Sequence, residues 1–136
     1  MPLNRLVDAY ANRYRQLDLP AFLTALQRRY QIQRAWAQMF DRVDVLLLPT
    51  SLGRPFENDL DFTSPDRIPE IIDMQMPLFV ANLLGLPAAS LPTHLADGLP
   101  VGVQMVGPMH DDWFLLDVAE TLEKELEPLW PQLKLS

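Results

Sequence analysis

Three side chains of the types found in hydrolytic triads lie close together in the sequence: Ser90, His94 and Asp97. In such a triad the serine attacks a carbonyl carbon, and a histidine that the aspartate orients takes the serine's proton. However, Ser90 has no Gly-x-Ser-x-Gly turn around it and alternates with apolar neighbours, as a strand residue does. His94 and Asp97 fall in a stretch with the composition of a loop. We therefore do not interpret these residues as a triad.

A second polar group, His110-Asp111-Asp112, has side chains that can bind metal ions. Three consecutive residues seldom converge on one ion, and either aspartate can cap the helix predicted to follow, where the helix dipole favours negative charge. The glycines after position 97 are too widely spaced for a phosphate-binding loop. With no cysteine in the chain, thiolate chemistry is excluded. We expect no metal, no cofactor and no catalytic residue in this chain.

The elements that would position a site follow from the spacing of apolar residues. Residues 3–17 and 21–41 each repeat apolar side chains at helical intervals. Pro20 suits the start of the second helix, because the first helical turn needs no backbone donor there. The sequence therefore opens with two predicted helices.

The run 43–49, VDVLLLP, is apolar without alternation, which is typical of a strand buried on both faces. Such a strand needs helices on both sides, so the sequence predicts an α/β sheet. Pro49 and Thr50 stand at the carboxyl end of this strand, the edge at which open α/β sheets place ligand sites.

The stretch 82–107 contains two strand-like runs, each opened by a Leu-Pro step, with a turn-rich loop between them. Before it, Pro77 should break a helix and Gly85 should end it. From residue 52 on we predict a proline-rich loop, this interrupted helix, two strands and a last amphipathic helix, over 52–69, 70–84, 87–91, 101–106 and 112–127.

The composition is that of a globular α/β protein, with 49% apolar and 21% charged residues among 136. Thirteen prolines indicate many forced turns, and the chain has the character of a piece of a larger protein. We predict a single partial domain over 1–136, with a helical lead-in over 1–42 and the strands, loop and last helix over 43–136. No apolar run reaches the ~18 residues of a membrane span, and no signal peptide is visible, so we expect a cytoplasmic location.

Charge is distributed unevenly between these two parts. Residues 1–42 carry seven arginines against three aspartates, whereas the whole chain has a net charge of −7. Arginines on a solvated helix face beside an acidic body explain this pattern, and the acidic whole would repel a polyanion. We therefore expect neither nucleic acid nor a membrane as a partner.

Four consecutive features resemble the C-terminal part of amidase-signature enzymes. They are DVLLLPT (44–50), ANLLGLPAASLP (81–92), GLPVGVQMVG (98–107) and the amphipathic helix that follows, and together they cover about 36–126. The resemblance implies an α/β/α sandwich around a mixed sheet. It also implies a serine amidohydrolase with a Ser–cis-Ser–Lys triad, in which a neutral lysine is the base and backbone N–H groups form the oxyanion hole.

The chain departs from that family pattern at the catalytic residues. The Gly-Ser-Ser-Gly-rich signature and its upstream lysine are absent, and the only lysines are Lys124 and Lys134. The nucleophile, base and oxyanion hole are therefore expected from a separate N-terminal portion.

The resemblance implies a substrate-binding role for four residues. Pro49, Thr50 and the loop after them would face the substrate, and Asn82 and Gly85 would hold the turn that approaches it. Relatives that act on glutamine bound to transfer RNA have an acidic residue before the Asn-Leu turn, and Gln75 takes that place here, which argues against that subgroup.

We therefore expect the C-terminal part of an amidase, which supplies a pocket wall and sheet for a small-molecule amide but not the triad. The alternative is a non-catalytic, truncated amidase-like protein that acts as an interaction or structural module. Because an interrupted sheet exposes strand edges and apolar faces, we also expect a homo-oligomer, or poor solubility without a partner.

Overall fold

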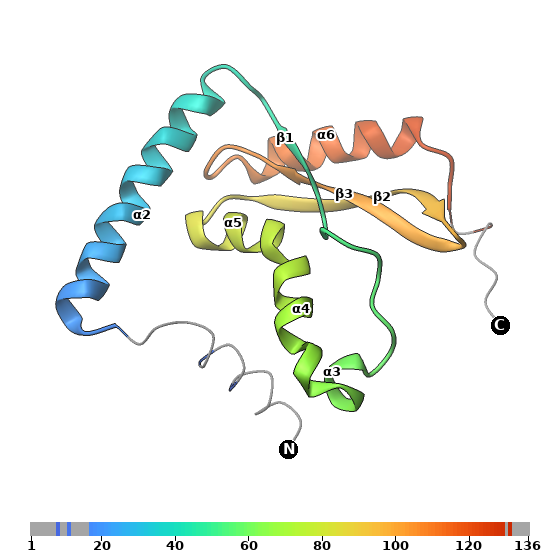
Figure 1. The fold of residues 1–136 in the computed structure, drawn as a ribbon. Helices are drawn as coiled ribbons and strands as arrows, with labels where there is room; N and C mark the ends of the chain where they lie inside the picture. The colour runs from blue at the N-terminus through green and yellow to red at the C-terminus, as the bar shows by residue number, and fades with distance from the viewer. Residues whose placement is uncertain (1–7, 9–10, 12–16, 130, 132–136) are drawn as a thin grey trace.

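The computed structural model of the chain describes Asp8, Ala11, residues 17–129 and Pro131 (Figure 1). The helix predicted over 3–17 lies outside these residues apart from Asp8, Ala11 and Leu17, so it stays a prediction. No helix in the described ranges combines the length and apolarity needed to cross a bilayer.

Helix α2, Leu19–Phe40, confirms the second predicted helix. Its N-terminus is capped by Asp18, whose carboxylate accepts a hydrogen bond from the Ala21 N–H at 2.9 Å. None of its residues is buried, and it lies along one side of the molecule (Figure 1). Side chains of α2 reach α5, Met76–Leu84: Arg29 donates to the Leu83 carbonyl, and Gln33 donates to the Leu84 carbonyl at 2.7 Å.

The sheet has three strands in the order β1-β3-β2: β1 Leu46–Pro49, β2 Ala88–Ala96 and β3 Leu99–Val106. Strand β3 is central and pairs antiparallel with both neighbours. The described strands therefore pair only in the antiparallel direction, whereas we expected both parallel and antiparallel pairs in the sheet of the whole fold.

Strands β2 and β3 form one long hairpin, so the prediction of a loop between residues 91 and 101 is wrong. Only Asp97 and Gly98 lie outside the strands, and their φ angles of 53° and 81° suit a tight two-residue turn. The prolines that suggested a loop are accommodated: Pro92 adjoins a register shift on an edge strand, and Pro100 lies beyond the end of β1, which pairs no further than Val103.

The helix predicted over 70–84 is two helices, α4 Ile68–Met74 and α5, and the break lies at Gln75 rather than Pro77. Pro77 stands in the first turn of α5, where a missing N–H costs nothing. Within a continuous helix its ring would clash with the preceding turn, so a new helix has to begin just before it. The loop predicted over 52–69 likewise contains two short elements, α3 Leu60–Thr63 and η1 Pro65–Arg67.

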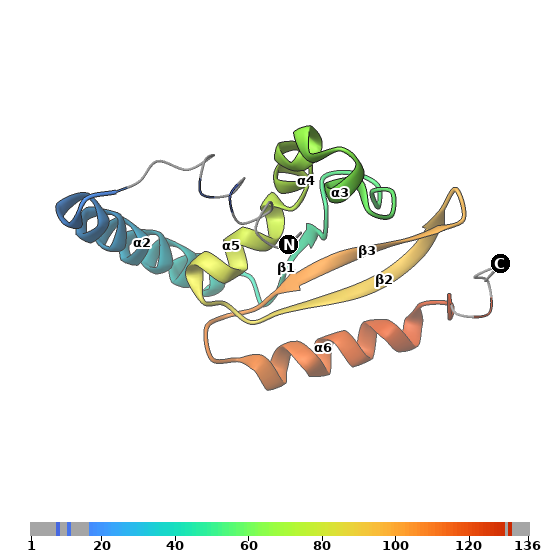
Figure 2. The same cartoon turned by 90° about the horizontal axis from the view of Figure 1, so that it is seen from below.

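Helices cover both faces of the sheet, as Figure 2 shows: α4 and α5 lie on one side and α6, Asp112–Glu125, on the other. The centre of these layers is apolar, and Gln104 of β3 is the exception, with its side-chain amide donating to the Pro77 carbonyl at 3.2 Å. This hydrogen bond ties β3 to the start of α5. The least accessible side chains are Ile68, Ile72, Leu84, Met105 and Val106.

Strand β1 departs from the prediction of burial on both faces. Its residues alternate between half-buried and exposed, and Leu47 is 56% exposed. The reason is its place at the sheet edge: α6 packs mainly on β2, so it does not cover β1. The leucine-rich run therefore leaves apolar surface open in this chain.

Candidate functional site

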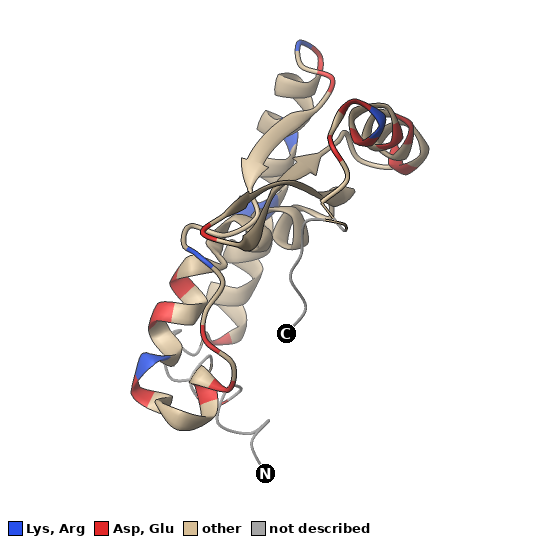
Figure 3. Ribbon diagram, turned by 90° about the vertical axis from the view of Figure 1, so that its right-hand side faces the viewer, with Lys and Arg blue, Asp and Glu red and all other residues tan. Residues whose placement is uncertain are grey.

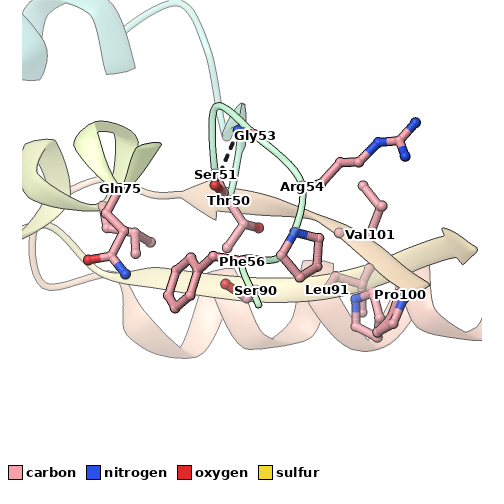
Figure 4. A pocket seen from close by; sticks show the side chains of 14 residues that line it. Thr50, Ser51, Gly53, Arg54, Phe56, Gln75, Ser90, Leu91, Pro100 and Val101 are labelled. Carbon is pink, nitrogen blue, oxygen red and sulfur yellow. Dashed lines mark hydrogen bonds between the residues drawn. The ribbon is translucent and has the colours of Figure 1, made fainter. Parts of the chain in front are cut away.

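A cavity of about 380 Å³ opens where the segment after β1 meets the α4–α5 junction and the β2–β3 hairpin (Figure 4). The local folding explains this meeting point. Strand β1 ends at Pro49, so Thr50 lies in one wall of the cavity. Gln75, at the break between α4 and α5, lies in a second wall, and the hairpin forms the third. The lining includes Thr50, Arg54, Phe56, Gln75, Ser90 and Val101.

The Thr50 hydroxyl is the most unusual polar group in this cavity. Its Oγ1 is buried and has no hydrogen-bond partner among the described residues. Leaving such a group unpaired costs about 1–3 kcal/mol, so a buried hydroxyl normally has a partner. The neighbouring Ser51 differs, because its Oγ accepts a hydrogen bond from the Gly53 N–H at 3.3 Å.

The remaining walls are mostly apolar, with uncharged polar groups between them. The Phe56 ring, Leu78, Leu91 and Val101 provide hydrocarbon surface, and Gln75 contributes a carboxamide. Such surroundings lower the effective dielectric, which strengthens any hydrogen bond that a ligand makes there.

Among the described residues that line the cavity, Arg54 has the one ionisable side chain. Its guanidinium lies 2.6 Å from the carboxylate of Asp97 at the hairpin turn, and both side chains are largely exposed. An exposed pair of this kind contributes at most about 1 kcal/mol to stability. Solvent screens both charges, so the pair only partly offsets the positive charge of Arg54 at the cavity's edge.

A larger cavity of about 490 Å³ lies beside α2, between Tyr30, Arg34 and Phe40 on the helix and Leu86 and Met109 opposite. Volume alone would favour it as a binding site. We favour the smaller cavity, because its wall holds the buried hydroxyl without a partner, which is a specific reason to expect a ligand.

The structure separates the four residues that the sequence proposed for substrate binding. Thr50 lines the cavity, whereas Pro49 belongs to β1 and pairs with Val103. Asn82 lies on α5 and donates to the Leu78 carbonyl at 3.1 Å, and Gly85 ends that helix with a φ of 67°. These last three are absent from the lining, and their part in substrate binding stays a prediction.

Phe56 lines the cavity and lies in the loop after Thr50 that the resemblance placed near the substrate, whereas the sequence alone did not indicate Ser90 or Val101, which also line it. The alternation of Ser90 with apolar neighbours did indicate a strand residue with one polar face, and that signal could have found it. Nothing in the neighbouring sequence indicates Val101.

The residues that suggested a triad are not assembled into one. Ser90 and His94 lie four residues apart on β2, which separates their Cα atoms by roughly 13 Å. The His94 Nδ1 lies 3.0 Å from the Thr93 hydroxyl, and Asp97 pairs with Arg54 instead.

The two aspartates that follow His110 lie at the start of α6. Asp111 is the N-cap residue and Asp112 lies in the first turn, as the sequence predicted, although Asp111 makes no side-chain capping hydrogen bond. Within the described part of the chain, no group of three or more His, Cys, Asp or Glu residues is placed to hold a metal ion.

Comparisons with known proteins agree with the architecture. The sequence pattern of the Amidase family matches residues 3–116. Indoleacetamide hydrolase from Bradyrhizobium japonicum is 38% identical over 110 residues, which cover 79% of this chain and 23% of that protein. One subunit of the glutamyl-tRNA(Gln) amidotransferase from Desulforamulus reducens is 34% identical over 113 residues, covering 78% and 21% respectively.

Solved structures show the same likeness. The corresponding glutamyl-tRNA(Gln) amidotransferase subunit from Thermotoga maritima superposes with a TM-score of 0.65 at 28% identity, covering 98% of this chain and 28% of that one. The fold of 6-aminohexanoate cyclic dimer hydrolase, bound to its substrate, matches with a TM-score of 0.66 at 24% identity, covering 92% and 28%. This chain thus spans between a fifth and three tenths of the length of these relatives, and it has the corresponding part of their α/β fold. The chain belongs to the Amidase family.

Proposed function

We propose that this chain forms one wall of the substrate pocket of an amidase that hydrolyses a small carboxylic amide to an acid and ammonia or an amine. The residues that line the cavity between β1, the α4–α5 junction and the hairpin form that wall. The catalytic groups come from polypeptide other than residues 1–136. Family membership supports the reaction class, and the cavity supports the location.

The lining explains why this chain would not catalyse the reaction alone. A serine nucleophile needs an adjacent base to take its proton. Ser51 and Ser90 line the cavity, but no histidine, lysine or carboxylate does so among the described residues. The Ser–cis-Ser–Lys triad implied by the family resemblance has no counterpart in the sequence.

The observation that carries the proposal is the unpaired hydroxyl of Thr50. A hydroxyl can donate one hydrogen bond and accept others, so it suits an amide, which offers both an N–H and a carbonyl. The oxygen is covered in this structure, so a ligand or a neighbouring segment would relieve the cost of the buried group only if the wall moved enough for it to reach Oγ1. Thr50 also ends the DVLLLPT segment, one of the motifs that carry the family resemblance.

A chimeric enzyme tests this proposal. The region of Bradyrhizobium japonicum indoleacetamide hydrolase that matches this chain would be replaced by it, and ammonia release from amides would be measured. We expect an active chimera whose kcat/KM falls by roughly tenfold on Thr50→Val, since one hydrogen bond is worth about 1–1.5 kcal/mol. Thr121→Val is the matched control, because Thr121 is exposed on α6, away from the cavity, and donates to the Asp117 carbonyl there.

The alternative, a non-catalytic interaction or structural module, makes the opposite prediction. A chimera that folds, by circular dichroism and gel filtration, yet releases no ammonia would contradict our proposal and favour the module. Purified residues 1–136 should release no ammonia from simple amides, and release by that chain would contradict the assignment of the triad to other polypeptide.

A further inference from the structure

We infer that Gln104 is a positioning residue for the proposed pocket. Its side chain holds the break between α4 and α5 against the sheet, and thereby fixes where Gln75 stands in the cavity wall. The inference rests on the proposed function, because it assigns a role in the same pocket to a residue that is not among those lining the cavity.

Gln104 lies on the central strand, among the apolar residues of the core. Its exposed fraction is 3%, and its side-chain amide donates to the Pro77 carbonyl at 3.2 Å. A buried carboxamide costs free energy unless it is hydrogen-bonded. Pro77 lies in the first turn of α5, where a carbonyl accepts the regular helical N–H from four residues on, so the helix does not need a second donor. An apolar side chain of the same length would fill the site at no greater cost, so stability alone does not explain this glutamine.

The register of the sheet places Gln104 on the same face as the cavity. It lies directly opposite Leu48 of β1 and Ser90 of β2, and residues paired across strands in this way point to one face of a sheet. Ser90 lines the cavity, so Gln104 stands on the face that α4 and α5 cover (Figure 2). Figure 4 shows Gln75 reaching into the cavity from the helices and Ser90 from the sheet.

The helix break is tied to the segment after β1 as well. The Leu52 N–H donates to the Met74 carbonyl at 2.8 Å, and the Leu78 N–H donates to the Gln75 carbonyl at 3.0 Å. Residues 74–78 thus connect two walls of the cavity, and the amide of Gln104 fastens them to the third, the hairpin. Short helices depend on tertiary contacts for their stability, so the loss of this contact should loosen the break.

The other end of α5 offers a matched control. Gln33 of α2 also donates its side-chain amide to a carbonyl of α5, that of Leu84, at 2.7 Å. The Leu86 N–H, which donates to the Ala81 carbonyl at 3.0 Å, reports on that end. Two glutamines therefore hold the two ends of one helix, and Gln104 holds the end that belongs to the cavity.

Amide hydrogen exchange of the purified chain, followed by NMR, tests the inference. Gln104→Met removes the donor at similar length. It should lower the protection of the Leu52 and Leu78 amides by roughly three- to tenfold, the factor that corresponds to one net hydrogen bond, and leave Leu86 unchanged. Gln33→Met should do the opposite, lowering the protection of Leu86 and sparing Leu52 and Leu78.

Gln104→Glu tests for rescue by a conservative variant. A neutral carboxylic acid has nearly the shape of a carboxamide and can donate its O–H to the Pro77 carbonyl, whereas a carboxylate can only accept. Burial disfavours the charged form and so raises the pKa of a carboxyl. The protection factors of Leu52 and Leu78 should therefore match those of the parent in mildly acidic solution and fall as pH rises through the pKa of the introduced carboxyl. In Gln104→Met they should stay low at every pH.

The chimeric enzyme provides the functional measurement. Gln104→Met should raise KM by roughly three- to tenfold with little change in kcat, since a displaced wall weakens the binding of substrate and transition state alike. Gln33→Met should change neither constant.

The outcomes separate this inference from the proposed function. Unchanged protection of Leu52 and Leu78 in Gln104→Met would overturn the inference, and so would an equal loss at Leu86, which would indicate general destabilisation. Lower protection with an unchanged KM in an active chimera would leave Gln104 a purely structural residue. If Gln104→Met does not fold, the pH dependence of Gln104→Glu decides instead. A folded parent chimera without activity would overturn the proposed function, whereas exchange in the purified chain would still decide whether Gln104 orders the break.

Discussion

At the scale of single residues, the substrate-binding role that we propose for Thr50 opposes stability. Its buried hydroxyl lacks a partner among the described residues, so it destabilises the free chain and favours whatever ligand or neighbouring segment completes it. A residue selected for stability alone at this position would be apolar and of the same shape.

The first prediction follows from this cost. Thr50→Val should leave the free energy of unfolding unchanged or raise it by about 1 kcal/mol, since it removes an unsatisfied polar atom at nearly constant volume. Urea unfolding followed by circular dichroism measures the change. Thr121→Val should instead be neutral or slightly destabilising, because it deletes a hydroxyl that already has a partner. A clear loss of stability in Thr50→Val would show that the hydroxyl is satisfied in solution.

A second residue pair, Arg67 and Glu70, joins η1 to α4 beside the site. The guanidinium donates two hydrogen bonds of 2.9 Å to the Glu70 carboxylate. These bonds, together with the positive charge, hold the pKa of Glu70 below its ordinary value. Because the folded-state pKa is depressed, the contribution to stability is present at neutral pH and is lost as pH falls through that lowered pKa.

The second prediction is that Arg67→Gln returns the pKa of Glu70 toward the ordinary range of about 4.3. An NMR titration of the Glu70 carboxyl carbon measures the pKa directly. The stability difference between parent and variant should be small, because both groups are exposed, and should disappear in strongly acidic solution. Arg28→Gln on α2 is the control. An unchanged pKa of Glu70 in Arg67→Gln would contradict the assigned cause.

At the scale of elements, the β2–β3 hairpin determines the shape of the cavity. The two strands approach so closely at Gly102 that a Cβ there would lie 2.6 Å from the Leu91 carbonyl oxygen, which is backbone and cannot rotate away. Gly102 and Leu91 both line the cavity, so the close approach and the wall share the same residues. Glycine at this point is therefore a packing requirement of the hairpin.

The third prediction compares two glycines. Gly102→Ala should destabilise the chain by about 1–3 kcal/mol, because the strands must separate. Gly53→Ala should cost less, since its Cβ would meet the flexible end of the Met74 side chain at 2.8 Å. The urea concentrations at the unfolding midpoints of the two variants show which substitution destabilises the chain more. Equal or reversed effects would show that the hairpin accommodates a methyl group at Gly102.

At the scale of the whole molecule, this chain has apolar surface that a complete fold would cover. The edge strand β1 exposes Leu47, and α2 exposes apolar side chains including Phe22 and Leu23 with no buried residue of its own. Figure 3 shows acidic residues along much of α6, but this helix also exposes Trp113 at 81% and Leu116 at 52%. Because β1 also has an unpaired strand edge, we expect partners, or further copies of the chain, to approach from the side of β1 and α2.

The fourth prediction concerns self-association. The purified chain should form concentration-dependent oligomers in sedimentation velocity, because it presents an unpaired strand edge and exposed leucines. Leu47→Lys should shift the distribution toward monomer. Leu116→Lys on α6, where the leucine is similarly exposed at 52%, should have little effect. A stable monomer at all concentrations would contradict the homo-oligomer that the sequence led us to expect.

The sequence by itself determined the features that depend on neighbouring residues. Apolar spacing located α2 and α6, the DVLLLP run located β1, and the ordered motifs identified the family. Local periodicity predicts the helices and strands because each of them must turn its apolar residues to one side.

Tertiary structure alone decided the features that join distant parts of the chain. The hairpin continues through two prolines because cross-strand pairing outweighs their local preference, and the helix breaks at Gln75 because α5 must begin just before Pro77. The cavity brings Thr50, Gln75 and Ser90 together across forty positions, and only packing can do that. The same packing left Asn82 and Gly85 outside the lining, although they share a motif with the strand that forms it.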